Sequence, residues 1–263
     1  MPANVNFGFG LVTYLWGKDW DLGTLISNCE KSGMGAVELR TTHKHGVEPS
    51  LSAKQRAEVS ARFADSPVTC VGPGSNERFD SPDAEQLKKA VATTKAFIRL
   101  SHDIGATGVK VKPDSFHKGV PRERTIEQIG KALRELADFG EGFGQEVRLE
   151  VHGGCSHLPD IKAIMDVADH PGAVVCWNSN RQDLEGDGLA ANFAMVKDRF
   201  GATAHVRELN IGDYPYAELV KLIVDAEYRG WILLEARTSP ADRVAALIEQ
   251  RKVFEGMVAK AAG

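Results

Sequence analysis

Charged and amide side chains lie at the ends of several β-strands that the sequence predicts. They come from four successive apolar runs and are Glu150, His152, Asn178, Arg207 and Glu235. Two carboxylates could remove and return a proton, because general acid–base catalysis needs both an acid and a base. Carboxylate, imidazole and amide groups are also ligands of divalent metal ions. The residue types therefore indicate proton-transfer chemistry, metal binding or both.

Eight short runs rich in β-branched residues alternate with longer amphipathic stretches, a pattern typical of βαβ units around a parallel sheet. The predicted strands are 9–14, 36–41, 68–72, 108–112, 147–152, 173–178, 204–210 and 231–236. Helices are predicted to start near Asp21, Ser50, Ser81 and Ser239, and to end near Gly33, Gly105, Gly140, Gly144 and Gly230.

Closure of these strands into a barrel is favoured over an open sheet. An open doubly wound sheet usually carries a glycine-rich phosphate loop after its first strand. Here Gly8 and Gly10 lie at or inside the first predicted strand, and no Pro/Gly/Ser-rich linker divides the chain. We therefore predict an α/β fold, a single (β/α)8 TIM barrel that forms one domain over residues 1–263.

Composition excludes several classes of partner. The 263 residues include 32 basic and 36 acidic side chains, for a formal net charge of −4, so a nucleic acid held by its phosphates is not expected. No run of about 18 apolar residues occurs, and the first residues lack the features of a signal peptide. We expect a cytoplasmic protein with no membrane partner and with four reduced cysteines.

The polar residues fall at one end of the predicted barrel. Side chains at positions i and i+2 of a strand share a face, which pairs His205 with Arg207 and Glu235 with Arg237. Active sites of such barrels lie at the C-terminal ends of the strands. Buried unpaired charges are costly, so their clustering there predicts a functional site. Trp177, by contrast, is predicted to pack between the barrel and a helix.

These runs resemble the xylose isomerase-like TIM-barrel superfamily over the whole chain. The resemblance is carried by the segments 149–154, 175–180, 204–207 and 232–235, and segment 38–49 looks like a subgroup labelled sugar phosphate isomerase/epimerase. The superfamily contains sugar isomerases and epimerases, hydroxypyruvate isomerase, inosose dehydratase and endonuclease IV.

The resemblance implies a metal site. In the sugar epimerases of this superfamily, Glu, Asp, His and Glu from strands five to eight hold a divalent metal, and the two glutamates also move the substrate proton. Carried over residue by residue, the ligands are Glu150, Asn178, His205 and Glu235, with Glu150 and Glu235 as the catalytic pair. The implied cofactor is Mn, Mg, Zn or Co.

Strand six departs from the family pattern, because the family's Asp-x-x-His is here Asn178-Ser179-Asn180-Arg181. The amide oxygen of Asn178 can still bind a hard cation. Arg207 has no lone pair to donate. Its positive charge, alone or with that of Arg181, Arg237 or Lys112, could instead occupy the place of the metal and hold Glu235 as an ion pair. Metal-bound and metal-free sites therefore both remain open.

The predicted activity is isomerisation or epimerisation of a sugar or sugar phosphate through an enediolate. The expected substrate contacts are Arg40, His45, Lys112, His152, Asn178, Arg207 and Arg237. A lyase or dehydratase acting on a keto-sugar would use the same residues, and a non-catalytic sugar-binding barrel is a further alternative. Segment 240–260 could pack on its own barrel or on another copy, and we expect a homo-oligomer.

Overall fold

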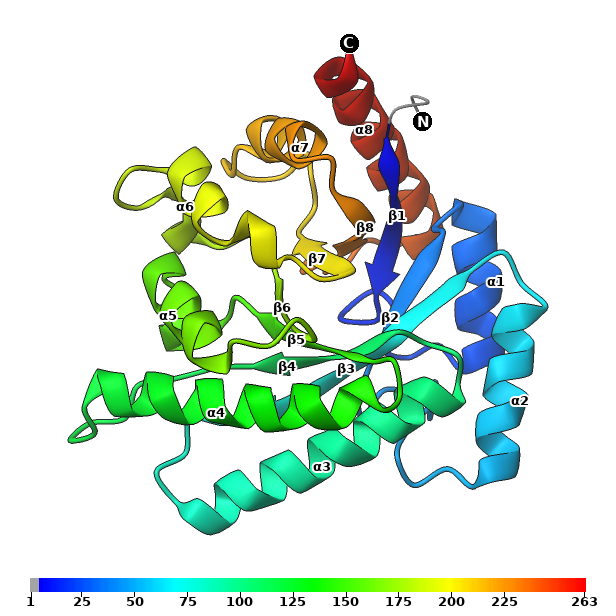
Figure 1. Cartoon of the computed structure of the whole chain (residues 1–263). Helices are drawn as coiled ribbons and strands as arrows, with labels where there is room; N and C mark the ends of the chain where they lie inside the picture. Colours follow the sequence, from blue (N-terminus) through cyan, green and yellow to red (C-terminus); the bar gives the residue numbers. More distant parts are fainter. Residues whose placement is uncertain (1–4) are drawn as a thin grey trace.

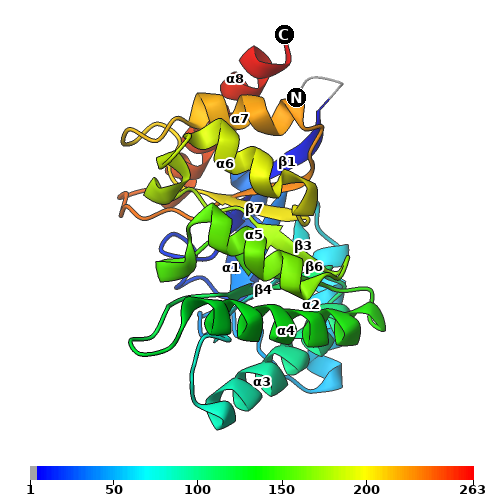
Figure 2. The same ribbon diagram turned by 60° about the vertical axis from the view of Figure 1, so that its left-hand side comes forward.

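Eight parallel strands form a nearly closed barrel surrounded by eight α-helices in a computed structural model that describes residues 5–263 (Figures 1 and 2). The strands are β1 Asn6–Val12, β2 Ala36–Arg40, β3 Thr69–Arg78, β4 Gly108–Lys112, β5 Glu146–Glu150, β6 Ala173–Cys176, β7 Thr203–Val206 and β8 Arg229–Leu234. The predicted (β/α)8 TIM barrel is confirmed.

The helices follow the strands in strict alternation. They are α1 Leu22–Ser32, α2 Ala53–Ala64, α3 Ala84–Asp103, α4 Arg122–Glu141, α5 Leu158–Ala168, α6 Leu189–Val196, α7 Tyr216–Asp225 and α8 Arg243–Ala262. Three short 3-10 helices, Gly153–Cys155, Arg181–Leu184 and Lys197–Arg199, lie between them. Helix α8 packs on its own barrel against α1 and α7, and the homo-oligomer stays a prediction.

Several helix ends follow the predicted signals. Asp21 caps α1 by accepting from Thr24 N at 2.8 Å, and Gly33 ends it with a φ of 70°. Three other starts lie two or three residues later than predicted, because the residues whose side chains cap α2, α3 and α8 are Ser52, Asp83 and Asp242. Helix α4 ends at Glu141, one residue after the predicted Gly140, whereas the helix end predicted near Gly230 was wrong, since Gly230 lies in β8.

Two strands differ most from prediction. Strand β3 continues to Arg78 through a segment whose glycine and proline are typical of a turn. A Cβ at Gly74 would lie 2.5 Å from Glu38 Oε1, so glycine there leaves room for that carboxylate. Strand β7 ends at Val206, four residues early, because the next backbone N–H, that of Arg207, donates to the Tyr216 hydroxyl at 3.0 Å instead.

The strand order is β6-β5-β4-β3-β2-β1-β8-β7, so the ladder ends at β6 and β7. That side is bridged by isolated pairings between Val175 and Phe200 and between Asn178 and His205. The backbone N–H of His205 donates to Trp177 O at 2.7 Å. The barrel is therefore closed, at the C-terminal ends of β6 and β7, by a pairing between two predicted metal ligands, Asn178 and His205.

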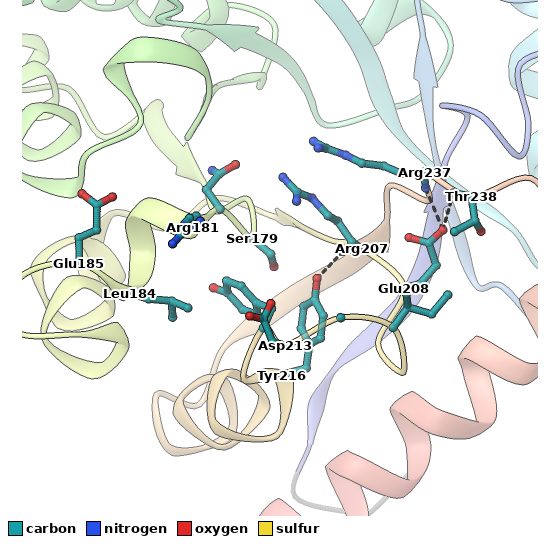
Figure 3. A pocket seen from close by; sticks show the side chains of 14 residues that line it. Ser179, Arg181, Leu184, Glu185, Arg207, Glu208, Asp213, Tyr216, Arg237 and Thr238 are labelled. Carbon is teal, nitrogen blue, oxygen red and sulfur yellow. Dashed lines mark hydrogen bonds between the residues drawn. The ribbon is translucent and has the colours of Figure 1, made fainter.

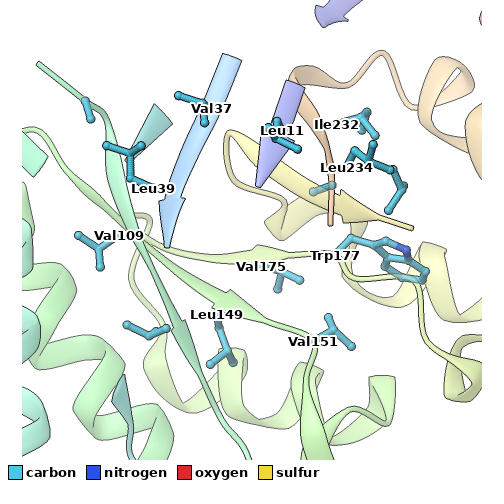
Figure 4. Close-up of a cluster of buried hydrophobic side chains, with 14 of the residues drawn as sticks. Leu11, Val37, Leu39, Val109, Leu149, Val151, Val175, Trp177, Ile232 and Leu234 are labelled. Atoms are coloured by element: carbon cyan, nitrogen blue, oxygen red, sulfur yellow. The ribbon is translucent and has the colours of Figure 1, made fainter. Parts of the chain in front are cut away.

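The apolar core lies mainly between strands and helices. Figure 4 shows part of this layer, which includes Leu11, Val37, Leu149, Val175 and Ile232. Trp177 is 1% exposed and packs on Phe193 and Phe200, as predicted. All four cysteines are free and buried, in agreement with the predicted reduced thiols.

The barrel interior is filled by the alternate residues of the same strands. A second apolar cluster of Val12, Ala36, Val71 and Leu233 lies apart from the main core. Gly8 belongs to β1, and a Cβ there would lie 2.3 Å from the Trp231 ring, so this glycine makes room for a side chain of β8. Among residues 5–263, no helix combines the length and hydrophobicity that a bilayer crossing requires.

Candidate functional site

Three predicted ligands converge at the C-terminal end of the barrel. Glu150 ends β5, His205 lies in β7 and Glu235 directly follows β8. One ligand atom from each lies within 4.8 Å of the others, and all three residues are buried. These three side chains are therefore close enough to hold one metal ion.

Glu150 is fixed by two neighbouring strands. Lys110 Nζ of β4 lies 2.8 Å from Glu150 Oε2, and the Asn178 amide donates to Glu150 Oε1 at 2.8 Å. Burial raises the pKa of Glu150, but the charges of Lys110 and His205 outweigh burial and hold it well below its usual value. Glu150 is therefore an anion in this site.

Glu38 orients the histidine. His205 Nε2 lies 3.2 Å from Glu38 Oε2, and both side chains are at most 1% exposed. In the neutral imidazole, which is the form that binds a metal, a proton on Nε2 donated to Glu38 leaves the lone pair on Nδ1, which lies 3.7 Å from Glu150 Oε1. Burial lowers the pKa of His205, but its neighbours, including Cys176 and Glu38, raise it well above its usual value.

The donor set fits a divalent cation. Among the described residues, the buried atoms His205 Nδ1 and Asn178 Oδ1 have no hydrogen-bond partner, although buried polar atoms are normally paired. Both can donate a lone pair to a metal. The cluster also contains three buried carboxylates and one buried ammonium, namely Glu38, Glu150, Glu235 and Lys110. A metal at this site would displace the proton from His205 Nδ1, because a ligating imidazole is neutral, and the carboxylates would then balance the charge of the ion.

The cation paired with a glutamate of the candidate metal site is the buried Lys110, rather than Arg207. Sequence reasoning placed Arg207 beside Glu235 as the group that could stand in for a metal. In the structure Arg207 lies beyond the end of β7 and lines a neighbouring cavity, whereas Lys110 pairs with Glu150. Lys110 lies on the same strand face as Lys112, and Glu38 on the same face as Arg40. This period-two alternation is the sequence signal that points to Lys110 and Glu38.

His152 lies two residues beyond Glu150 and is held by a neighbouring loop. Its Nδ1 lies 2.9 Å from Asp114 Oδ1, and Arg78 Nη1 lies 2.5 Å from Asp114 Oδ2. Asp114 has a φ of 67°, which is uncommon for a non-glycine residue and costly to maintain. Sequence reasoning missed Asp114, because nothing in its local sequence links it to His152.

Two further predicted contacts lie on the β2 and β4 side. Lys112 is buried, and burial followed by the charge of Lys110 lowers its pKa. The guanidinium of Arg40 lies over the Tyr14 ring at 4.7 Å and donates to Asn76 at 3.2 Å. Lys112 has no ion pair among the described residues, which leaves its ammonium available to a ligand.

The side chain of His45 forms hydrogen bonds within its own loop. Its Nε2 lies 2.9 Å from Arg40 O, and its Nδ1 accepts from Val47 N at 3.1 Å. Because both ring nitrogens have backbone partners, His45 is not among the substrate contacts that we propose below.

A cavity of about 650 Å³ lies beside these ligands, over the ends of β6, β7 and β8. Arg207 and Arg237 line it, and Figure 3 shows their side chains extending in the same direction. Arg237 Nη2 lies 3.9 Å from Glu235 Oε2. The structure therefore places Arg207 and Arg237 together, away from Arg40 and Lys112.

Comparison with known proteins gives a consistent picture of the fold. The family model described as "Xylose isomerase-like TIM barrel" matches residues 26–256. L-ribulose 3-epimerase is 14% identical, with a TM-score of 0.84 over 97% of this chain and 96% of its own. A 3-keto-D-glucoside 4-epimerase from E. coli is 13% identical, with a TM-score of 0.80 over 95% and 99%.

The IOLI protein, whose structure contains a zinc atom, is also 13% identical, with a TM-score of 0.78 over 97% of this chain and 99% of its own. At these identities the structural matches show a shared fold. No curated protein matches this chain by sequence comparison.

Proposed function

Because this chain belongs to the xylose isomerase-like TIM barrel family, we propose that it is a metal-assisted isomerase or epimerase of a sugar derivative. The observation that carries the proposal is the buried set Glu150, His205 and Glu235, whose ligand atoms lie within 4.8 Å of one another. Sugar epimerases among the structural neighbours support the substrate class.

The proposed reaction moves a proton next to a substrate carbonyl. One of the two glutamates, Glu150 or Glu235, removes the proton to give an enediolate, and a glutamate returns a proton at the neighbouring carbon or on the other face. Glu150 suits the role of base because it is anionic, being paired with Lys110. A divalent ion at the site would supply Lewis-acid polarisation of the carbonyl.

The remaining side chains position the substrate. Lys112 can donate to a substrate oxygen, because its ammonium is buried without an ion-pair partner among the described residues. Asn178 and His152 offer hydrogen bonds to hydroxyls, and Asp114 holds His152 in place. Glu38 orients His205, so that Nδ1, with Asn178 Oδ1 and the two glutamates, would hold the metal.

One observation favours a lyase or dehydratase as a second candidate. Elimination needs a group that protonates the departing hydroxyl, in addition to the base. His152 is fixed by Asp114 at 2.9 Å and lies two residues beyond Glu150, the last residue of β5. Dehydration of a keto-sugar would use the same glutamates for the first proton transfer.

Metal titration followed by a substrate screen tests the proposed function. Metal-free protein should take up one equivalent of Mn, Mg, Zn or Co, because the site offers four protein ligands. At 100 times Kd, binding should stabilise the fold by about 2.7 kcal/mol and raise Tm by roughly 5 to 11 °C. Calorimetry and thermal unfolding measure these effects, and a panel of ketoses and keto-sugars then tests turnover.

Glu235→Gln is the control for this titration, because it removes one ligand and should abolish most of the thermal shift. If no metal binds to the unmodified protein, the metal-assisted mechanism fails and Lys110 is the cation of the site. If metal binds, and sugars bind without being converted or eliminated, the chain is instead a sugar-binding barrel.

The contact between Glu38 and His205 predicts a separate effect on metal affinity. Glu38→Gln should weaken metal binding about 10- to 100-fold, because partners of ligating histidines contribute this much. Activity should recover at high metal concentration, since Glu38 is not a proposed proton carrier. Calorimetric titration measures the affinity.

Glu48→Gln is the matched control, because this carboxylate of the loop after β2 accepts from Thr41 and Thr42 and makes no contact with His205. Equal metal affinity in Glu38→Gln and the unmodified protein would contradict the orienting role of Glu38.

A further inference from the structure

Three arginines from three different loops line the cavity beside the metal ligands. They are Arg181, Arg207 and Arg237. Each of these arginines lies in the segment that follows a strand carrying or preceding a candidate metal ligand. Arg207 is two residues from His205, and Arg237 is two residues from Glu235. The cavity therefore adjoins the ligands on the β6, β7 and β8 side, as Figure 3 shows for its lining residues.

The arginines of the cavity have few direct ion-pair partners. Arg181 and Arg207 form no ion pair among residues 5–263, and the nearest carboxylate contact of Arg237 is at 3.9 Å. Arg207 Nε is buried and has no hydrogen-bond partner in that part of the chain. A buried guanidinium N–H without an acceptor is costly, so this group lacks a partner that an anion would provide.

The acidic residues of the cavity mostly have other partners. Glu208 Oε1 accepts from Arg237 N at 2.9 Å and from Thr238 N at 2.7 Å. Glu185 lies 3.4 Å from His157, and Asp213 is exposed at the rim. None of these carboxylates forms an ion pair with Arg207 or Arg181 in the described part of the chain.

Asp183, behind the lining, is also committed to other groups. Its Oδ2 accepts from Asn180 N at 2.8 Å and from the Tyr214 hydroxyl at 2.7 Å. Burial raises the pKa of Asp183 to about 7, although the charge of Arg207 acts in the opposite direction. Asp183 therefore carries only part of a negative charge at neutral pH.

We propose that Arg207 and Arg237, together with Arg181, bind an anionic group of the substrate, a phosphate or a carboxylate. The planar guanidinium forms paired hydrogen bonds to either group. The cavity volume of about 650 Å³ accommodates a group attached to a sugar. The position of the reacting carbons, between Glu150 and Glu235, rests on the proposed function, whereas the anion site does not.

Binding measurements with matched ligands test the proposal. Fructose, fructose 6-phosphate and fructuronate share a ketose skeleton and differ in the charge of the terminal group. Calorimetry should show the phosphate or the carboxylate form binding at least tenfold tighter than fructose, and the tighter of the two identifies the anion. Inorganic phosphate should bind to the same site in the absence of any sugar.

Arg207→Gln should remove about 10- to 100-fold of the affinity for the charged ligand, as expected for loss of a charge-assisted hydrogen bond, and leave fructose binding unchanged. Arg134→Gln, on the exposed side of α4, is the matched control and should behave like the unmodified protein. Arg237→Gln provides a second test, and thermal unfolding checks that each variant folds.

The two proposals fail in different ways. Conversion of neutral ketoses, with no tighter binding of any charged form, would overturn the anion site and leave the isomerase intact. Phosphate binding that is lost in Arg207→Gln supports the anion site even if no sugar is turned over. Equal phosphate affinity in Arg207→Gln and Arg134→Gln overturns it.

Discussion

Glu150→Gln should lower turnover by about 10²- to 10⁴-fold, because this is the usual contribution of a positioned acid or base. Glutamine is nearly isosteric but cannot accept the substrate proton, and it offers a metal no anionic oxygen. Steady-state kinetics at saturating metal measures the loss. Added metal should not restore activity, in contrast to Glu38→Gln, because the missing group carries the proton.

Loss of stability must be separated from loss of chemistry in this variant. Glu150→Gln leaves the Lys110 ammonium buried without its 2.8 Å partner. Glu146→Gln is the matched control, since it lies at the other end of the same strand and its carboxylate pairs with buried Arg148 at 2.8 Å. It should lose stability but keep its activity. Unchanged turnover in Glu150→Gln would exclude this residue as the base.

Arg148→Ala should destabilise the barrel by about 3–5 kcal/mol, the usual cost of breaking a buried charged network. Arg148 is 1% exposed inside the barrel. Its guanidinium donates to Glu146 Oε2 at 2.8 Å, to Val71 O at 2.7 Å and to Thr107 Oγ1 at 2.7 Å. Alanine would remove all three of these hydrogen bonds and create a cavity between β3, β4 and β5. Urea unfolding measures the change.

Two companion variants test this explanation. Arg148→Met retains much of the volume and should cost clearly less than alanine, because apolar replacement of a buried charge is often tolerated. Arg134→Ala removes a half-exposed arginine of α4 and should change stability by less than about 0.5 kcal/mol. An Arg148→Ala protein as stable as Arg134→Ala would mean that the interior arginine does not hold these strands together.

The alternation of strand and helix could be predicted because each element has its own hydrophobic period. Buried parallel strands are nearly continuous apolar runs, and helices repeat every three to four residues. Strand ends were less certain. The prediction for β3 stopped at Gly72 because glycine and proline usually mark turns, but in this chain they admit the Glu38 carboxylate. That requirement comes from a different strand, and local sequence does not contain it.

The candidate site could be predicted in part for the same reason. Period-two alternation places Glu150, His205 and Glu235 inside the barrel, and the structure brings their ligand atoms together. Alternation also turns Glu38 and Lys110 inward, but it did not pair them with His205 and Glu150. Alternation gives the face of a side chain, whereas contact also depends on the relative height of neighbouring strands. Arg207 was misplaced because its strand ends before it.

The candidate metal site lies where the two ends of the strand order meet. Glu150 and Asn178 belong to one end of the strand order, and His205 and Glu235 to the other, so an ion held by all four would fasten the two ends of the sheet. Metal binding and closure of the barrel would then be thermodynamically coupled, because an ion that needs ligands from both ends of the sheet stabilises the closed form. The stability of the contact between β6 and β7, where β-ladder pairing is sparsest, would then depend most strongly on whether an ion is bound.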